Sequence, residues 1–412
     1  MATIEQLTRS EDLLVAEVIS SGSPCRFAKT FDLVIIGAGP AGTYLAWLLA
    51  RQGFSPVIID HSFPTDKPAL DLVPVEYLSK FPVLGALVQK EGTDNLLHIL
   101  SPGGKEAVIA NALDSRAAVS VSNPSRYLLH SAISRGARFI PERVTSIHYE
   151  NGLWKITTTK HQIRARNLAG ADGVKSFVRK ALYKPFSRKD LLLVLGYEVS
   201  GLPESSYVKF IPGRQGLLKA RGSCCSGTVE ISDTLINSAG LKKDLNTFLS
   251  GLAGNIKILN SWSVLIPRAS SSDFFRSPSL GKEWILIGDA AGHVHPLTGD
   301  GLIYALWSAD IAAQAITAGD MRLYEILWRK EYGNELQKAA DSINLFFRRG
   351  FIETTIKLAA NSPTLSNLLF GILCGSGTPG LMIRNSLIKA PSILYDMVRK
   401  SKPEHQSVGH SV

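Results

Sequence analysis

Residues 31–60, FDLVIIGAGPAGTYLAWLLARQGFSPVIID, constrain the fold more than any other part of the sequence. Residues 33–36 form an unbroken apolar, β-prone run that stops at Gly37, which is typical of a buried strand. Residues 41–51 are then rich in helix formers, and a second apolar run leads to Asp60. The pattern predicts a strand, a tight turn, a helix and a second strand.

The turn carries the pattern GxGxxG, in which each glycine has a physical task. Gly37 allows the sharp turn, Gly39 lets the backbone approach a pyrophosphate, and Gly42 lets the helix pack closely on the sheet. The amides at the helix start face the phosphates, where the helix dipole favours negative charge. A carboxylate about 20 residues downstream can accept hydrogen bonds from an adenosine ribose. The pattern predicts a dinucleotide site, NAD or FAD, with these binding residues: Gly37, Gly39, Pro40, Ala41, Gly42 and Asp60.

A second glycine-rich segment lies far along the chain, at residues 284–305, WILIGDAAGHVHPLTGDGLIYA. A short apolar run leads into Gly288 and Asp289, a loop passes through Pro296, and three residues, Gly299, Asp300 and Gly301, open another helix at Leu302. Two further motifs lie between the glycine-rich segments. Residues 169–179 read AGADGVKSFVR and contain Asp172 and Gly173, and Arg126 precedes Tyr127, Leu128 and Leu129.

These four motifs, in this order, resemble FAD-dependent oxidoreductases of the geranylgeranyl reductase type and their aromatic-hydroxylase relatives, over residues 31–400. The resemblance implies that Asp289 contacts the ribityl and phosphate region of FAD, and that Asp172 and Gly173 lie near the diphosphate. The resemblance also places Arg126 at the position of an arginine that helps to hold FAD in the family. The residues implied beside the isoalloxazine ring are Pro296, Gly299, Asp300, Gly301 and Leu302, and Gly288 is a further expected cofactor-binding residue. A helix that opens after glycines can stabilise negative charge on a reduced flavin.

The sequence departs from these relatives in two regions that shape the pocket. Many of them carry a KPCGGG-like run, whereas here Lys67 and Pro68 precede Ala69, Leu70 and Asp71, so the usual loop thiol is absent. Their YxWxFP-like hairpin is replaced by residues 212–219, PGRQGLLK, which predicts a different substrate specificity. Residues 262–267 are similar to the WxWxIP run of flavin-dependent halogenases, but a core strand is the better interpretation because Val264 replaces the second tryptophan.

The fold implied by the resemblance is α/β, with a Rossmann-like FAD-binding domain, an inserted antiparallel β substrate domain and a helical C-terminal region. A chain of 412 residues exceeds what one hydrophobic core usually supports. β-like runs between Leu191 and Arg268 favour a sheet that forms one wall of a substrate pocket. The expected boundaries are an N-terminal extension at 1–30, the FAD-binding domain at 31–190 and 280–320, the substrate domain at 191–279 and the helical region at 321–412.

Composition excludes some classes of function. No apolar run reaches the ~18 residues that span a bilayer, and residues 1–30 have no signal-type core, which favours a cytoplasmic protein. The four cysteines show no metal-ligand spacing. His293 and His295 are expected to contact cofactor or substrate rather than a metal. The sequence shows no basic stripe with interleaved aromatic residues, so it gives no indication of nucleic-acid binding.

Much of the net charge of +10 gathers in the helical region after residue 321. Basic residues beside apolar helices could bind an anionic membrane surface, from which a lipid enters the pocket, or could form a solvated helix face over an ordinary core. Both interpretations stay open at this point.

The implied reaction is the reduction of carbon–carbon double bonds in a polyprenyl chain, an isoprenoid substrate. FAD would carry the redox chemistry, with electrons from NAD(P)H or a protein donor. No catalytic residue and no proton donor can be assigned from the sequence. Two alternatives stay open: a flavin-dependent monooxygenase or halogenase acting on a hydrophobic small molecule, and a non-enzymatic lipid-binding protein.

Overall fold

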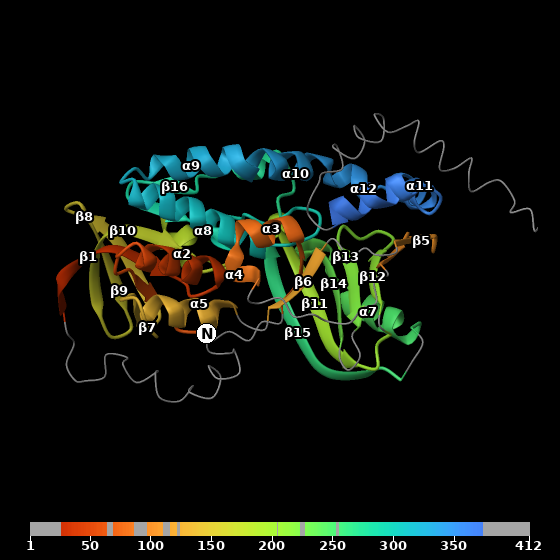
Figure 1. Cartoon of the computed structure of the whole chain (residues 1–412), viewed down its shortest axis with the longest axis horizontal. Coiled ribbons are helices and arrows are strands. Elements are labelled where there is room, and N and C mark those ends of the chain that lie inside the picture. Colours follow the sequence, from red (N-terminus) through yellow and green to blue (C-terminus); the bar gives the residue numbers. More distant parts are fainter. Residues whose placement is uncertain are drawn as a thin grey trace, which may run out of the picture.

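The computed structural model of the chain forms two lobes, one on each side of the view in Figure 1. One lobe is built on a mostly parallel sheet and the other on a mostly antiparallel sheet, and C-terminal helices run along the top of both. The structure describes residues 26–63, 69–85, 97–109, 116–121, 124–203, 205–222, 227–252 and 255–373. The sequence class, α/β with a Rossmann-like part and a helical C-terminal region, is confirmed.

The first sheet has the order β16-β17-β10-β1-β2-β7, with β9 and β8 continuing from β10. Its central strands β17, β10, β1, β2 and β7 are parallel. Val34 and Ile35 in β1 are fully buried because both faces of the sheet are covered. The strands are β1 (Arg26–Ile36), β2 (Val57–Ile59), β7 (Arg138–Ile140), β8 (Val144–Glu150), β9 (Leu153–Thr158), β10 (Gln162–Gly170), β16 (Leu280–Gly281) and β17 (Trp284–Leu286).

Helices α2 (Pro40–Arg51), α5 (Pro124–Ile133) and α8 (Leu302–Thr317) form a layer in which α2 packs against both of the others. The expected strand, turn, helix and strand at residues 31–60 is therefore confirmed. Apolar residues of α2 and α8, such as Leu45, Leu49 and Leu306, join Ile35 in one buried cluster. Three short helices complete this part, α3 (Val75–Lys80), α4 (Pro82–Gly85) and α6 (Phe177–Leu182).

The second sheet has seven strands in the order β15-β11-β14-β13-β12-β4-β5. They are β15 (Lys257–Pro267), β11 (Leu191–Ser200), β14 (Gly227–Thr234), β13 (Leu217–Gly222), β12 (Ser206–Phe210), β4 (Leu97–Leu100) and β5 (Glu106–Ile109). The β-like runs after Leu191 are confirmed as strands. The sheet also takes β4 and β5 from outside residues 191–279, because β4 pairs in parallel with β12.

Strands β12 and β13 form a hairpin, and residues 212–219, the segment expected to replace the relatives' YxWxFP-like hairpin, span its turn and the start of β13. Helix α7 (Leu241–Ser250) packs on the face of the sheet that contains Val229 and Ile231. A separate pair of antiparallel strands is formed by β3 (Ala69–Pro74) and β6 (Arg116–Val121). Ala69, Leu70 and Asp71, where the sequence departs from the relatives' KPCGGG-like run, are the first residues of β3.

The C-terminal region is helical through residue 373, as expected. It consists of α9 (Arg322–Trp328), a π-helical turn (Arg329–Gly333), α10 (Asn334–Phe346), α11 (Arg349–Ala359) and α12 (Pro363–Leu373). Helices α11 and α12 pack on β5 and close the second lobe. None of the helices in the described ranges is long and apolar enough to span a membrane.

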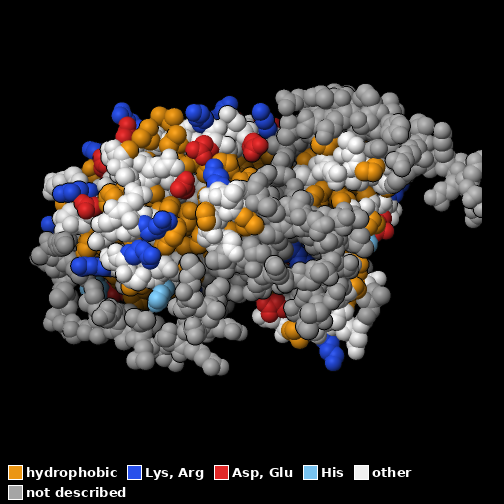
Figure 2. All heavy atoms as spheres, in the orientation of Figure 1, with side chains coloured by type: hydrophobic (Ala, Val, Ile, Leu, Met, Phe, Trp, Pro, Cys, Tyr) orange, Lys and Arg blue, Asp and Glu red, His pale blue; other side chains and the backbone are white. Residues whose placement is uncertain are grey.

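Basic side chains lie along the edge formed by α9 and α10, with acidic side chains among them (Figure 2). Arg322 pairs with Asp320 at 2.9 Å, and Arg329 pairs with Glu325. Part of the positive charge that the sequence places in this region is therefore neutralised locally. The basic residues after Lys357, which begin at Arg384, lie outside the described residues.

Candidate functional site

In the glycine-rich turn between β1 and α2, two of the three glycines leave no room for a Cβ atom and the third does. Gly37 has φ of 108°, and a Cβ there would overlap the carbonyl oxygen of Ala171. A Cβ on Gly42 would overlap the carbonyl oxygen of Gly37. At Gly39, by contrast, a Cβ would meet no atom within 4 Å. The outer glycines thus serve packing, while the middle one leaves the free space that a pyrophosphate needs against the backbone.

Helix α2 begins directly after this open position. Gly39 is its N-cap residue, and Pro40 stands in its first turn. Pro40 fits there because the first amides of a helix have no partner within the helix. The amides of Ala41 and Gly42 in the same turn carry the positive end of the helix dipole. Their arrangement suits an anion over Gly39.

Asp60 follows β2 and lies beside the turn. Its Oδ2 accepts a hydrogen bond from the Ala38 amide at 2.8 Å, and its Oδ1 accepts bonds from the amide and hydroxyl of Ser62 at 2.8 and 2.9 Å. An ionised carboxylate has about four acceptor sites, so these bonds leave capacity for a ribose hydroxyl. The ribose contact of Asp60 stays a prediction, and Ser62 was not expected from the sequence.

Asp172 lies next to the same turn, but its carboxylate is turned into helix α6. It accepts hydrogen bonds from the Ser176 hydroxyl at 2.5 Å and from the amides of Phe177 and Val178 at 2.6 and 3.1 Å. Burial raises the pKa of Asp172 against the lowering effect of these bonds. Gly173, with φ of 75° and no atom within 4 Å of a Cβ, is the open part of this motif.

The second glycine-rich segment packs directly against the first. Gly288 has φ of 56°, and a Cβ there would lie 3.0 Å from Cβ of Ala41 in α2. The Gly288 amide donates to the Ser308 hydroxyl in α8 at 2.9 Å. Segments that are far apart in the sequence therefore form one site at the ends of β1 and β17.

The loop from Asp289 to α8 is held by its own backbone. The His295 amide donates to the Asp300 carbonyl and the Gly299 amide donates to the His295 carbonyl, both at 3.0 Å. A Cβ on Gly301 would lie 3.1 Å from Oδ1 of Asp289. Leu302 is buried as the first residue of α8.

Two arginines, Arg126 and Arg268, differ in their exposure to solvent. Arg126, which the sequence assigned to cofactor binding, is exposed on the first turn of α5, beside α2, and its role stays a prediction. Arg268, which the sequence did not single out, is 2% exposed and donates through Nε to the Pro296 carbonyl at 3.2 Å.

A charged cluster joins the second sheet to the glycine-rich loop. Lys219 in β13 donates to the Thr298 carbonyl at 2.9 Å and to Oδ1 of Asp300 at 3.1 Å, and its Nζ lies 3.8 Å from Oε1 of Glu230. Burial raises the pKa of Glu230, although Lys219 opposes this. Burial acts in the same sense on Asp300, but Lys219 and the Thr298 hydroxyl outweigh it and lower its pKa. Within the cluster, Glu230 is the group suited to hold a proton.

The two histidines of the loop face protein groups rather than each other. His293 is 1% exposed, and its Nδ1 lies 2.9 Å from the Tyr332 hydroxyl. Burial, with Arg329 and Arg179 nearby, lowers the pKa of His293 to about 3. Nδ1 of His295 lies 3.1 Å from the Thr298 hydroxyl. These histidines fix the loop from two sides.

Comparisons with known proteins agree with this geometry. The NAD(P)-binding Rossmann-like domain family matches residues 35–62. The chain is 24% identical over 386 residues to a menaquinone reductase of Mycobacterium tuberculosis, covering 83% of this chain and 90% of that protein. It is 26% identical over 356 residues to a digeranylgeranylglycerophospholipid reductase of Methanosarcina acetivorans, covering 77% of this chain and 84% of that protein.

A solved structure shares the fold across both lobes. It is a geranylgeranyl bacteriochlorophyll reductase-like protein from Thermoplasma acidophilum, with a TM-score of 0.71 and 18% identity, covering 90% of this chain and 99% of that chain. The resemblance read from the four motifs is thereby confirmed: over most of its length, the chain is similar to flavoprotein oxidoreductases of the geranylgeranyl reductase type.

Proposed function

We propose that this protein is an FAD-dependent oxidoreductase that reduces carbon–carbon double bonds in a polyprenyl lipid. The observation that carries the proposal is that the Gly37 turn, the Gly173 motif and the Gly288 segment lie against one another: a Cβ on Gly37 would meet Ala171 and Asp172, and one on Gly288 would meet Ala41. Gly39 and Gly173 each have free space beside them, whereas a Cβ on Gly37 or Gly42 would overlap backbone atoms. A dinucleotide with two phosphates fits such a backbone cradle.

The residues would hold FAD in three groups. Backbone from Gly39 to Gly42 and at Gly173 would bind the diphosphate, with Arg126 beside it. Asp60 would bind the adenosine ribose, and Asp289 the ribityl chain. The loop from Pro296 to Leu302 would lie along the flavin ring, where the start of α8 favours negative charge.

Bound FAD would supply the hydride for the reduction. The chain would orient the alkene, keep water out and provide a proton. Glu230 is suited to hold that proton on its carboxyl group, because burial raises its pKa and its side chain is half-buried beside the loop. Lys219 would position Glu230 relative to Thr298 and Asp300.

The substrate class rests on the relatives. A menaquinone reductase and a digeranylgeranylglycerophospholipid reductase both favour an isoprenoid lipid as substrate. The start of strand β3 departs in sequence from the relatives' KPCGGG-like run and lacks its cysteine. This difference favours a substrate specificity that is not the same as theirs. NAD(P)H and a protein donor both remain candidates for the electron source. A cytoplasmic protein that binds the membrane surface peripherally would meet such a lipid.

The experiment is anaerobic photoreduction of the purified protein with its flavin, followed by reoxidation with a geranylgeranyl lipid or with oxygen. Faster reoxidation by the lipid, with a saturated product, is the expected result. Rapid reoxidation by oxygen with no effect of lipid would instead favour a monooxygenase. A colourless protein that FAD does not reconstitute, yet that binds the lipid, would favour a lipid-binding protein.

A further inference from the structure

A pocket lies beside the Pro296 loop, where Arg268 of its lining contacts the Pro296 carbonyl. Its volume is about 280 Å³, and its polar lining consists mainly of Lys189, Gln215, Asn237, Arg268, Ser270 and Asn344. This volume is at the low end of the ~300–1,000 Å³ found for small-molecule sites. Among the described residues that line the pocket, the charged side chains are the cations Arg268 and Lys189, and none is a carboxylate. The pocket therefore suits a small anion.

Arg268 is a buried cation without a dedicated acidic partner. Its guanidinium bonds are to the Pro296 carbonyl at 3.2 Å and, weakly, to the Gln215 side chain at 3.4 Å. No carboxylate among the described residues lies within ion-pair distance of it. Burial lowers the pKa of Arg268 to about 10, although Asp233 and Asp190 oppose this from further away. A buried cation is costly unless an anion and hydrogen bonds compensate it.

The two carboxylates nearest to Arg268 are committed elsewhere. Asp233 is fully buried and accepts bonds from the Arg214 guanidinium at 3.2 Å and the Asn237 side chain at 2.8 Å. The amides of Gln215 and Thr234 also donate to it. Oδ1 of Asp190 accepts the hydroxyl of Ser270 at 2.6 Å. Neither carboxylate forms an ion pair with Arg268, although both act on it from a distance.

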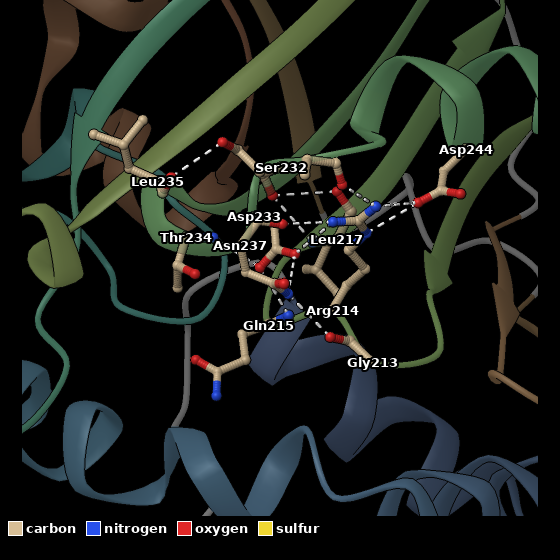
Figure 3. A network of polar contacts seen from close by, with 12 residues as sticks. Gly213, Arg214, Gln215, Leu217, Ser232, Asp233, Thr234, Leu235, Asn237 and Asp244 are labelled. Atoms are coloured by element: carbon tan, nitrogen blue, oxygen red, sulfur yellow. Dashed lines mark hydrogen bonds and ion pairs between the residues drawn. The ribbon is translucent and has the colours of Figure 1, made fainter.

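The Asp233 network makes one wall of the pocket rigid (Figure 3). Arg214 also pairs with Asp244, and Asn237 donates to the Gly213 carbonyl at 3.1 Å, so the loops on both sides of the wall are tied together. In the same view, the side chain of Gln215 extends away from the network. The wall is preorganised, which lowers the entropic cost of binding a ligand.

We propose that this pocket binds a phosphate or diphosphate group through Arg268 and Lys189. A guanidinium presents paired donors that match phosphate oxygens, and two cations match an oxyanion with more than one negative charge. Lys189 is exposed and lines the same pocket as the buried Arg268, so one anion could contact both. The group is either free phosphate or the head group of a phosphorylated lipid, and Ile236, 67% exposed at the rim, gives an alkyl chain an apolar contact.

The test is isothermal titration of the flavin-loaded protein with inorganic phosphate and with diphosphate, at constant ionic strength because salt screens such contacts. Lys189→Ala is compared with Arg188→Ala, since Arg188 is an exposed neighbour that is not among the lining residues of the pocket. Arg268→Gln removes the charge of the buried cation in the same pocket. We expect saturable binding that weakens about tenfold or more in the Lys189 and Arg268 variants and stays unchanged in the Arg188 variant.

Two further titrations, with geranylgeranyl diphosphate and with geranylgeraniol, distinguish the sources. Tighter binding of the diphosphate than of the alcohol, lost in Lys189→Ala and competed by inorganic phosphate, assigns the site to a lipid head group. Phosphate binding that is the same with and without bound lipid assigns it to the free anion. Absent binding of both oxyanions, or equal binding by wild type and Lys189→Ala, overturns the proposal. The titration does not depend on lipid reduction, so failure of the proposed reaction would be seen separately.

Discussion

Nζ of Lys219 lies 3.1 Å from Oδ1 of Asp300 and thereby joins the second sheet to the glycine-rich loop of the first lobe. The same ammonium faces Glu230, its partner across strands β13 and β14. The ammonium of Lys219 thus lies between two carboxyl groups, Glu230 with a raised pKa and Asp300 with a lowered pKa. Environments that separate two pKa values in this way are typical of acid–base sites.

We predict that Glu230→Gln lowers lipid reduction about 100-fold or more while the protein keeps its flavin, because a general acid typically contributes 10²–10⁴-fold. Since the pKa of Glu230 is raised, the wild-type rate should fall as pH rises through that pKa, and the variant should lose this dependence. Single-turnover reoxidation of the reduced flavin by lipid across a pH series measures both effects.

The matched control for this variant is Glu198→Gln. In the pairing of β11 with β14, Glu198 lies opposite Thr228, and Gly196 lies opposite Glu230. Since side chains two residues apart in a strand share a face, Glu198 lies on the same face of the sheet as Glu230. It should keep the wild-type rate and pH profile. Equal losses in both variants would mean that Glu230 does not supply the proton.

The glycines of the turn should separate cofactor binding from folding. Gly39 has φ of −71° and ψ of −177°, which any residue can adopt, and its Cβ direction is open. Gly39→Val is therefore expected to lose more than about 90% of bound flavin with an unfolding temperature close to that of the flavin-free wild type. Flavin absorbance per protein and calorimetry test this.

Gly37→Val is the contrasting variant, because φ of 108° and the nearby Ala171 carbonyl leave no room for a side chain. It should destabilise the flavin-free protein by more than about 2 kcal/mol. If Gly39→Val unfolds as readily as Gly37→Val, the open space over Gly39 is not a ligand cradle.

Much of this cradle is predictable from sequence because it depends on local chemistry. Apolar runs that stop at glycines specify the strands, and residues 37–42 specify the turn whatever the rest of the chain does. The side chain of Asp172 was assigned to the cofactor region, yet it caps α6. A signal for this was present, since Ser176 is a good N-cap residue that follows it in the sequence.

The Lys219 cluster and the Arg268 pocket were not predictable, because they depend on contacts between distant strands. Lys219 and Asp300 lie on separate elements, and neither has a neighbour in sequence that indicates the other. The same holds for strand β3, whose partner β6 begins only at Arg116. Non-local pairings of this kind follow from the assembled topology rather than from any local pattern.

His293 should make the protein sensitive to acid. Its pKa falls from 6.5 to about 3 on folding, so between these values the unfolded chain binds a proton that the folded chain excludes. Stability should therefore decrease as pH falls below about 6.5, by about 1.4 kcal/mol per pH unit from this group. Urea unfolding at pH 7, 6 and 5 measures the slope.

The comparison variant for this effect is His293→Gln, which does not titrate in this range and can still bond Tyr332. Its stability should depend less on pH over the same interval. A slope equal to that of the wild type would assign the acid sensitivity to other groups.

Arg214 should stabilise the wall of the Arg268 pocket. Asp233, its partner, is fully buried, and loss of one member of a buried ion pair typically costs about 3–5 kcal/mol. Arg214→Ala should lower the free energy of unfolding by an amount in this range. Arg276→Ala, which removes an exposed pair with Asp273, should cost less than about 1 kcal/mol. Similar losses in the two variants would contradict this.

The parallel pairing of β4 with β12 has a consequence for synthesis of the protein. Leu97 and Ile99 of β4 leave the ribosome about a hundred residues before Ser206, the first residue of the strand that pairs with them. At ~5–20 residues per second, these side chains wait on the order of 5–20 s for their partner. During that time the β4–β5 hairpin is an unfinished sheet edge with buried-type residues exposed, and the nascent chain is most open to chaperones and to association with its own copies.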